Sequence, residues 1–328
     1  MNEVTPSSGP SASRPRVSII CPAYNEAAGI LNFLHQLDVT LAPWEAQYRF
    51  KVAVVDDGSG DDTAEQAAGY NPAAFELVVC RLTRNFGKEG AMQAGLERYA
   101  GEASIVVDTD LQHPLHLIPE MLRHWQAGAK VVESVKTDRG REARWYQWAS
   151  DCFYRGLRRL SGLELADHSD FKLLDAEVVA TLCALPEKTR FFRGLVQWTG
   201  YASVQLPFEV QDRAEGESSW GFWTLLRYSI HNLTSFSSAP LYLITLIGAL
   251  MLAVSAVLGS VSLYQWSQGI AVTGFTTVIL LLLFIGSMLM VSLGIIGLYI
   301  SRIYDELKQR PVYLVASETV KAPSPLAG

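Results

Sequence analysis

The chain has 328 residues, which is enough for one large domain or for two of ordinary size. Its formal net charge is −6, its isoelectric point is near 5.6 and it has no Lys/Arg-rich block, so nucleic acid is not expected as a partner. No cysteine stands in a Cys-x-x-Cys motif or a Cys/His cluster, which argues against zinc and disulfides. We expect buried, reduced thiols at Cys21, Cys80, Cys152 and Cys183.

The N-terminal segment, residues 1–16, is rich in Ser and Pro and contains no apolar core segment. This composition predicts a disordered tail and no signal peptide. The domain that follows, residues 17–218, is therefore expected to stay in the cytoplasm.

From Val17 onward, short apolar runs rich in β-branched residues alternate with segments of helical pattern. The expected strands are 17–21, 51–55, 76–82 and 103–107, and the expected helices cover about 27–41, a stretch from 61, and 87–100. This alternation predicts an α/β fold with a mainly parallel, Rossmann-like sheet covered on both faces.

Two aspartates, Asp108 and Asp110, directly follow the apolar run 104–107. A buried strand that ends in this way places both carboxylates in the crevice beyond the carboxyl edge of the sheet, where open α/β sheets bind ligands. Two hard oxygen ligands there suit Mg²⁺ or Mn²⁺, which commonly take one or two carboxylates plus substrate phosphates. A solvated acidic turn is the alternative for such a pair taken alone.

Other expected strands end in polar residues at the same edge. Asp56 and Asp57 open a helix, so one of them could bind a base or a ribose while the other caps the turn. Lys88, at the entry to a helix, could sit near a phosphate, although a surface lysine is the favoured interpretation of a lone basic residue. Gln112 extends the acidic loop and could add to a metal site, whereas His113 before Pro114 is weak support for one.

Two long uncharged apolar spans, about 240–264 and 273–300, each exceed the roughly 20 residues needed to cross a bilayer. We expect transmembrane helices over 239–264 and 273–300, joined by a short external loop, residues 265–272. Arg302, Lys308 and Arg310 follow the second span, which places the C-terminal tail, residues 301–328, in the cytoplasm.

The segment before the first span, residues 219–238, contains Trp and Phe side chains followed by Arg227 and His231. This pattern predicts an interfacial amphipathic helix. Such a helix would hold a catalytic site at the level of lipid headgroups, which favours a lipid acceptor over a soluble one.

Several segments taken together resemble the successive motifs of family 2 glycosyltransferases, and the later ones look like the polyprenyl-phosphate branch of that family. The segments are Ile20-Cys21-Pro22-Ala23-Tyr24-Asn25-Glu26, Val55-Asp56-Asp57-Gly58-Ser59, Arg84-Asn85-Phe86-Gly87-Lys88, Asp108-Thr109-Asp110-Leu111-Gln112, Asp170-Phe171-Lys172-Leu173, Arg190-Phe191-Phe192-Arg193-Gly194 and Arg213-Ala214-Glu215-Gly216-Glu217-Ser218. The resemblance extends from about Val17 to the C-terminus. It implies an inverting enzyme with the A-type nucleotide-sugar fold.

The resemblance also implies roles for individual residues. The residues expected to bind the nucleotide-sugar are Pro22, Tyr24, Glu26, Asp56, Asp57, Lys88 and Asp108. Asp108, Asp110 and Gln112 would hold Mg²⁺ or Mn²⁺ against the donor diphosphate. Asp170 would lie near the reacting sugar carbon, and together with Asp110 it is expected to be catalytic. The arginines expected to face phosphate groups are Arg139, Arg190, Arg193 and Arg213.

The chain departs from the family pattern after Ser218 and in the acidic loop, which reads Gln112-His113-Pro114-Leu115 where Asp-Pro-Pro or His-Pro-Pro is common. Ser218 is followed by Ser219 and Trp220, where the family usually has Lys and an aromatic residue, so one expected phosphate-binding cation is missing. Arg144-Trp145 looks like the end of the motif of processive polysaccharide synthases, but Arg141 stands where that motif has Gln. Chain elongation is therefore not expected.

The sequence predicts an enzyme of the bacterial inner membrane that transfers one sugar, with UDP-glucose favoured by resemblance, to a polyprenyl phosphate. Transfer to another membrane lipid, such as diacylglycerol, and a non-catalytic membrane scaffold are the alternatives. Small residues in the second span, Gly286, Ser287, Gly294 and Gly297, would allow helices to pack closely. The resemblance implies a homo-tetramer.

Overall fold

The computed structural model describes residues 14–136, 168–188, 190–208, 239–269 and 274–324. These residues divide into two units, which we describe separately. The sheet unit contains every described residue up to 208 together with those from 311 onward. The helical unit contains the described residues between 239 and 310.

The sheet unit is built on an eight-stranded sheet with the order β7-β5-β6-β4-β1-β2-β3-β8. Its strands are β1 (Arg16–Ala23), β2 (Arg49–Asp56), β3 (Phe75–Leu82), β4 (Ala103–Val106), β5 (Val131–Lys136), β6 (His168–Asp175), β7 (Ser203–Phe208) and β8 (Val315–Lys321). Six strands run in one direction, whereas β6 and β8 run against their neighbours. The mainly parallel α/β sheet expected from the sequence is confirmed.

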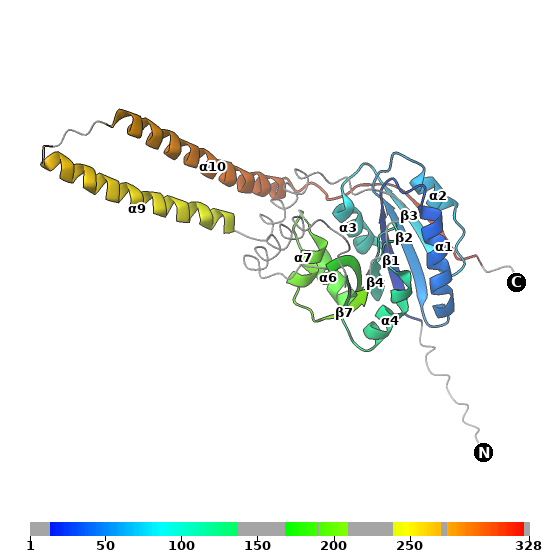
Figure 1. Ribbon diagram of the computed structural model, residues 1–328. Helices are drawn as coiled ribbons and strands as arrows, with labels where there is room; N and C mark the ends of the chain where they lie inside the picture. Colours follow the sequence, from blue (N-terminus) through cyan, green and yellow to red (C-terminus); the bar gives the residue numbers. More distant parts are fainter. Residues whose placement is uncertain (1–13, 137–167, 189, 209–238, 270–273, 325–328) are drawn as a thin grey trace, which may run out of the picture. The chain divides into compact units, whose positions relative to one another are not determined.

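Helices cover both faces of the sheet (Figure 1). The hydrophobic core on one face is shared with α1 (Ile30–Leu41), α2 (Thr63–Gly69) and α4 (Ile118–Gln126). The other face carries α3 (Lys88–Tyr99), α6 (Ala176–Ala184) and α7 (Phe192–Trp198). Short 3-10 helices at Ala42–Trp44 and Leu115–Leu117 complete the connections among the described residues.

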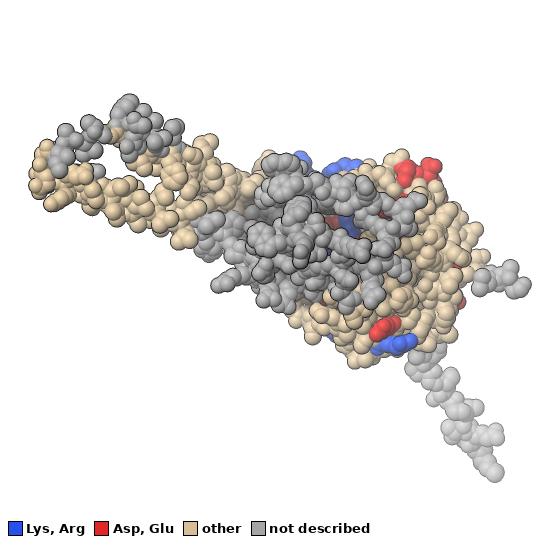
Figure 2. All heavy atoms as spheres, viewed as in Figure 1, with Lys and Arg blue, Asp and Glu red and all other residues tan. Residues whose placement is uncertain are grey.

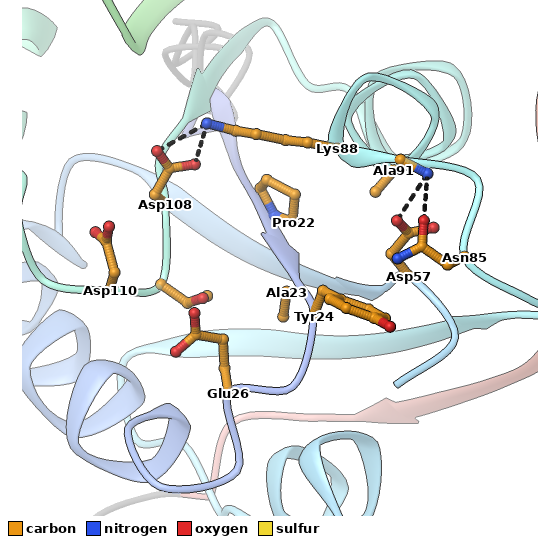
Figure 3. Close-up of a pocket in the computed structure, with 12 residues that line it drawn as sticks. Pro22, Ala23, Tyr24, Glu26, Asp57, Asn85, Lys88, Ala91, Asp108 and Asp110 are labelled. Atoms are coloured by element: carbon orange, nitrogen blue, oxygen red, sulfur yellow. Dashed lines mark hydrogen bonds and ion pairs between the residues drawn. The ribbon is translucent and has the colours of Figure 1, made fainter. Parts of the chain in front are cut away.

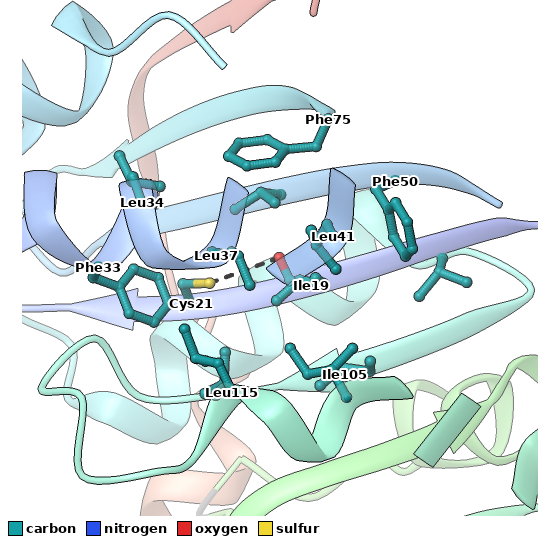
Figure 4. Close-up of a cluster of buried hydrophobic side chains, with 14 of the residues drawn as sticks. Ile19, Cys21, Phe33, Leu34, Leu37, Leu41, Phe50, Phe75, Ile105 and Leu115 are labelled. Carbon is teal, nitrogen blue, oxygen red and sulfur yellow. Dashed lines mark hydrogen bonds between the residues drawn. The ribbon is translucent and has the colours of Figure 1, made fainter. Parts of the chain in front are cut away.

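Much of this hydrophobic core lies between the sheet and α1. Alternate residues of β1 face it, including Ile19 and Cys21, because side chains alternate between the two faces along a strand. Helix α1 contributes one stripe of buried side chains at helical spacing, namely Ile30, Phe33, Leu34, Leu37 and Leu41. Figure 4 shows the last four of them against the sheet. Burial of each such side chain stabilises the fold by about 1.5–3 kcal/mol.

Helix α3 packs unusually close to the opposite face of the sheet. A Cβ added at Gly95 would overlap the side chain of Ile20 and would lie 3.3 Å from Cγ2 of Val55. Glycine at this position therefore lets α3 lie directly on β1 and β2. The close contact fixes the N-terminal end of α3 beside the carboxyl ends of these strands.

The helical unit contains α9 (Ala239–Ser267) and α10 (Phe275–Leu307). Both are long enough and apolar enough to cross a membrane. Most of their described surface bears neither acidic nor basic side chains (Figure 2). They correspond to the spans expected at 239–264 and 273–300, and α10 continues seven residues further. The interfacial helix expected over 219–238 lies outside the described residues.

The segment expected to be a C-terminal tail contains an ordered strand. Residues 301–307 complete α10, and β8 pairs antiparallel with β3 at the edge of the sheet. Arg98 of α3 binds the carboxylate of Glu318 on β8 at 2.7 Å, and the Tyr99 hydroxyl donates to the same carboxylate at 2.9 Å. The chain therefore returns to the sheet unit after the second long helix.

Candidate active site

A cavity of about 330 Å³ opens at the carboxyl edge of the parallel strands, beside the start of α3 (Figure 3). The residues that line it come from the end of β1, from the loops after β1, β2, β3 and β4, and from α3. They are Pro22, Ala23, Tyr24, Glu26, Asp57, Asn85, Gly87, Lys88, Ala91, Asp108, Thr109 and Asp110. The loops that the sequence predicted to meet at one edge do meet there.

Three carboxylates, those of Glu26, Asp108 and Asp110, lie on one side of this cavity (Figure 3). Burial raises the pKa of Glu26, and the negative charges of Asp110 and Asp108 raise it further. The backbone N–H of Gln112 donates to Asp110 Oδ1 at 3.0 Å, which holds the turn after β4. This acidic wall favours a cation.

Lys88, the first residue of α3, supplies a positive charge to the acidic wall. Its Nζ lies 2.7 Å from Asp108 Oδ1 and 2.6 Å from Asp170 Oδ2. Although burial lowers the pKa of Lys88, the charges of Asp170 and Asp108 outweigh burial and raise it. Lys88 therefore bridges the acidic loop after β4 and Asp170 of β6, while 40% of its side chain remains exposed.

Asp170 reaches the same place because β6 runs against β4. The first residues of β6 therefore lie at the edge where β4 ends, and Lys172 pairs with Val106. Arg193 of α7 donates to both carboxylate oxygens of Asp170, through Nε at 2.6 Å and Nη2 at 2.9 Å. Burial opposes ionisation, but Arg193 and then Lys88 hold the pKa of Asp170 well below its usual range.

His113 contacts Asp108 from the interior of the sheet unit. Its ring is buried against Phe171 and Phe208, and its Nε2 lies 3.4 Å from Asp108 Oδ2. Burial would raise the pKa of Asp108, but the hydrogen bond from His113 and the charge of Lys88 lower it overall. His113 therefore contacts the acidic loop from its buried side, a contact that its position before Pro114 did not predict.

The two aspartates at the carboxyl end of β2 have separate roles. Asp56 is fully buried and accepts hydrogen bonds from the backbone and hydroxyl of Ser59, so it closes the turn. Asp57 lines the cavity and accepts from the backbone N–H groups of Phe86 at 2.7 Å and Gly87 at 2.9 Å. Asp57 therefore joins the loop after β2 to the loop after β3.

Gly58 permits the close approach of those two loops, and Gly58→Ala tests it. Gly58 has a φ of +67°, and a Cβ there would lie 2.5 Å from the backbone carbon of Arg84. We expect a loss of stability greater than the roughly 1–2 kcal/mol that a left-handed conformation alone costs. We also expect weaker ligand binding, because the loop that lines the cavity must shift; UDP is the probe, since the sequence predicts a nucleotide-sugar donor.

Gly128→Ala is the matched control for thermal unfolding and UDP titration. Gly128 also has a positive φ, +100°, but a Cβ there meets nothing within 4 Å. Equal destabilisation by the two substitutions, with UDP binding unchanged in both, would contradict the predicted clash.

Other residues expected at the site lie elsewhere or lie outside the described chain. The guanidinium of Arg190 donates to the carbonyl oxygens of Leu182, Leu185 and Glu187, so it caps the C-terminal end of α6 and is not directed at a phosphate site. Gln112 does not line the cavity described above. Arg139 and Arg213 lie outside the described residues.

The sequence did not predict some of the residues at or beside the site. Asn85 and Thr109 line the cavity, and Glu89 lies beside Lys88 at the start of α3. Asn85 stands in the quoted Arg-Asn-Phe-Gly-Lys motif and Thr109 between the two aspartates, so motif position could have indicated both. For Glu89, no sequence signal pointed to the contact described below.

Asp108 and Asp110 could hold a divalent ion together with the phosphates of a bound ligand. Within the described ranges, no group of three or more His, Cys, Asp or Glu side chains is arranged to hold a metal ion. Mg²⁺ often uses one or two carboxylates together with substrate phosphates and water. Asp108 and Asp110 fit that pattern, since both line a cavity with room for phosphates.

A family model, glycosyl transferase family 2, matches residues 18–182. An uncharacterized glycosyltransferase of Synechocystis is 33% identical over 302 residues, covering 92% of this chain and 94% of that protein. A bactoprenol glucosyl transferase of Shigella phage SfV is 32% identical over 310 residues, covering 93% and 100%. This chain is a family 2 glycosyltransferase.

Further comparisons agree with the assignment. A prophage bactoprenol glucosyl transferase homolog of Escherichia coli K12 is 31% identical to this family 2 glycosyltransferase over 304 residues, covering 92% of this chain and 98% of the other. A glucosyl-3-phosphoglycerate synthase from Mycobacterium tuberculosis, solved with phosphoglyceric acid, has a TM-score of 0.50 and 21% identity, covering 68% of this chain and 80% of that one. The A-type fold expected from the sequence is confirmed.

Proposed function

We propose that this family 2 glycosyltransferase transfers one sugar, with UDP-glucose as the favoured donor, to a polyprenyl phosphate. The observation that carries the proposal is the similarity to proteins named bactoprenol glucosyl transferases, which covers 93% and 92% of this chain. Similarity over that length includes the two long apolar helices as well as the sheet unit. A shared acceptor that is itself a membrane lipid accounts for both parts.

The cavity has the chemistry that a nucleotide-sugar needs. Asp57, Tyr24 and Asn85 line the part that would receive the nucleoside, and Asp108 and Asp110 lie where the diphosphate would bind. A divalent ion held by these two aspartates would stabilise the charge that develops on the leaving diphosphate. Lys88 contacts Asp108, so its ammonium stands beside the same position.

Asp170 is suited to orient the acceptor and poorly suited to act as a general base. Arg193 and Lys88 hold its pKa well below the usual range, so the carboxylate stays ionised and binds protons weakly. A lipid phosphate is already an anion near neutral pH and needs little deprotonation. Its oxygen attacking the anomeric carbon from the face opposite the leaving group gives an inverted product.

The helical unit supports a membrane location. Helices α9 and α10 could span a bilayer, and the chain re-enters the sheet unit at β8 after α10. A hairpin of two spans would leave the sheet unit and both termini on the cytoplasmic side of the inner membrane. We also propose the homo-tetramer that the family resemblance implies, with the small residues Gly286, Ser287, Gly294 and Gly297 of α10 as contacts between subunits.

The test is transfer of radiolabelled sugar from a panel of UDP- and GDP-sugars to undecaprenyl phosphate by the full-length protein in Mg²⁺ or Mn²⁺. We expect one acid-labile lipid product from UDP-glucose that disappears with EDTA. A product formed only on diacylglycerol would instead support transfer to another lipid. Donor binding and transfer both absent would support the scaffold alternative.

A further inference from the structure

Glu89, the second residue of α3, makes a contact that links two helices at the active site. Its Oε2 accepts the backbone N–H of Phe192, the first residue of α7, at 2.9 Å. Phe191, which precedes α7, makes no capping hydrogen bond with its side chain. A residue from α3 therefore satisfies an N–H of the first turn of α7, which has no partner within its own helix.

The neighbours of these two residues both bind Asp170. Lys88 precedes Glu89 and lies 2.6 Å from Asp170 Oδ2, while Arg193 follows Phe192 and holds both oxygens of the same carboxylate. The hydrogen bond from Phe192 to Glu89 thus connects the backbone positions that carry the two cations. A shift of α7 away from α3 would move Arg193 relative to Lys88, and Asp170 would turn with one of them.

The contact depends on the length of the Glu89 side chain more than on its charge. Burial raises the pKa of Glu89 to about 8, and the nearby negative charge of Asp170 contributes. The carboxyl group is then largely protonated at neutral pH, yet its oxygen still accepts the N–H of Phe192. Glutamine has the same length and keeps an acceptor oxygen, whereas aspartate keeps the carboxyl group and is one methylene shorter.

We propose that Glu89 is a positioning residue for sugar transfer: by accepting the Phe192 N–H, it fixes α7 against α3 so that Arg193 and Lys88 hold Asp170 in one orientation. The inference rests on the proposed function, because it requires Asp170 to act on the transferring sugar or its acceptor. Glu89 does not line the cavity, so we expect it to act through Lys88 and Arg193 without contacting the substrate.

The test compares Glu89→Gln with Glu89→Asp in the full-length protein. We expect Glu89→Asp to lower kcat at least about tenfold with a donor KM within about twofold, and Glu89→Gln to stay within about threefold of wild type in kcat. Glu177→Asp is the matched control, since Glu177 is a glutamate in the first turn of α6 that binds Lys130 at 3.1 Å. Its kinetic constants are expected to be unchanged.

A double-mutant cycle then tests the route through Arg193. If Glu89 acts through that arginine, Glu89→Asp adds less than about twofold to the loss caused by Arg193→Lys. Independent, multiplicative losses would overturn the proposal, as would a Glu89→Gln protein that is as impaired as Glu89→Asp. Thermal unfolding is measured for each variant, and Glu89→Ala replaces Glu89→Asp if the latter does not fold.

The two levels of the proposal fail in different ways. A wild-type protein that transfers no sugar to polyprenyl phosphate contradicts the proposed function. An active wild type with full activity in both Glu89→Asp and Glu89→Ala contradicts only the positioning role of Glu89.

Discussion

Asp108→Asn is expected to lower kcat for sugar transfer by about 10³-fold, equivalent to about 4 kcal/mol of transition-state stabilisation. The asparagine side chain has no charge with which to hold a divalent ion or to pair with the Lys88 ammonium, which lies 2.7 Å away in the unsubstituted protein. Metal-dependent UDP binding should fall in parallel, and isothermal titration with UDP and Mn²⁺ measures it.

Asp62→Asn provides the matched control for that substitution. Asp62 is exposed, precedes α2 and does not line the cavity. Its variant is expected to bind UDP and transfer sugar like wild type. Retention of metal-dependent UDP binding by Asp108→Asn would contradict the assignment of the acidic loop to the metal and diphosphate.

Asp170→Asn is expected to lower kcat by at least about 10²-fold while leaving UDP binding nearly unchanged. Asparagine offers Arg193 a single acceptor oxygen in place of two and leaves the charges of Arg193 and Lys88 less compensated. Both cations are then drawn toward Asp108, away from the position they share with Asp170. The end of the cavity lined by Asp57 and Tyr24, which we propose receives the nucleoside, is not altered.

Steady-state kinetics with varied donor and varied lipid phosphate separate the two ends of the site. The control is Asp175→Asn at the other end of β6, where Asp175 accepts from Trp125 Nε1 at 2.8 Å and binds Lys130 at 2.9 Å. That variant should lose stability without a selective loss of kcat. An Asp170→Asn enzyme with normal kcat would rule out a role for Asp170 in orienting the acceptor.

The parallel half of the fold could be predicted because its signals are local. The strands β1 to β4 were each expected within two residues of their observed bounds, since each is a short apolar run ending in Pro, Asp or Asn residues. The directions of β6 and β8 could not be predicted in the same way. They depend on pairing between strands far apart in sequence, such as Leu77 with Lys321.

The candidate site was predictable in part for the same reason. Asp108 and Asp110 follow a buried strand, so their place at the sheet edge could be inferred from the chain alone. The different roles of Asp56 and Asp57 could not be inferred, because they depend on which carboxylate accepts from Ser59 and which accepts from the loop after β3. Arg190 and Arg193 flank one aromatic pair, yet only the structure shows that one caps α6 and the other binds Asp170.

The pairing of β8 with β3 makes the two apolar helices an insertion within the sheet unit and not an appendage to it. During synthesis β8 can pair with β3 only after both apolar helices have left the ribosome. Until then the edge of β3 is unpaired. A soluble fragment cut before α9 would keep that edge exposed. An expression fragment designed to stay monomeric should therefore carry residues 311–324 after residue 218, joined by a short linker that replaces the two helices.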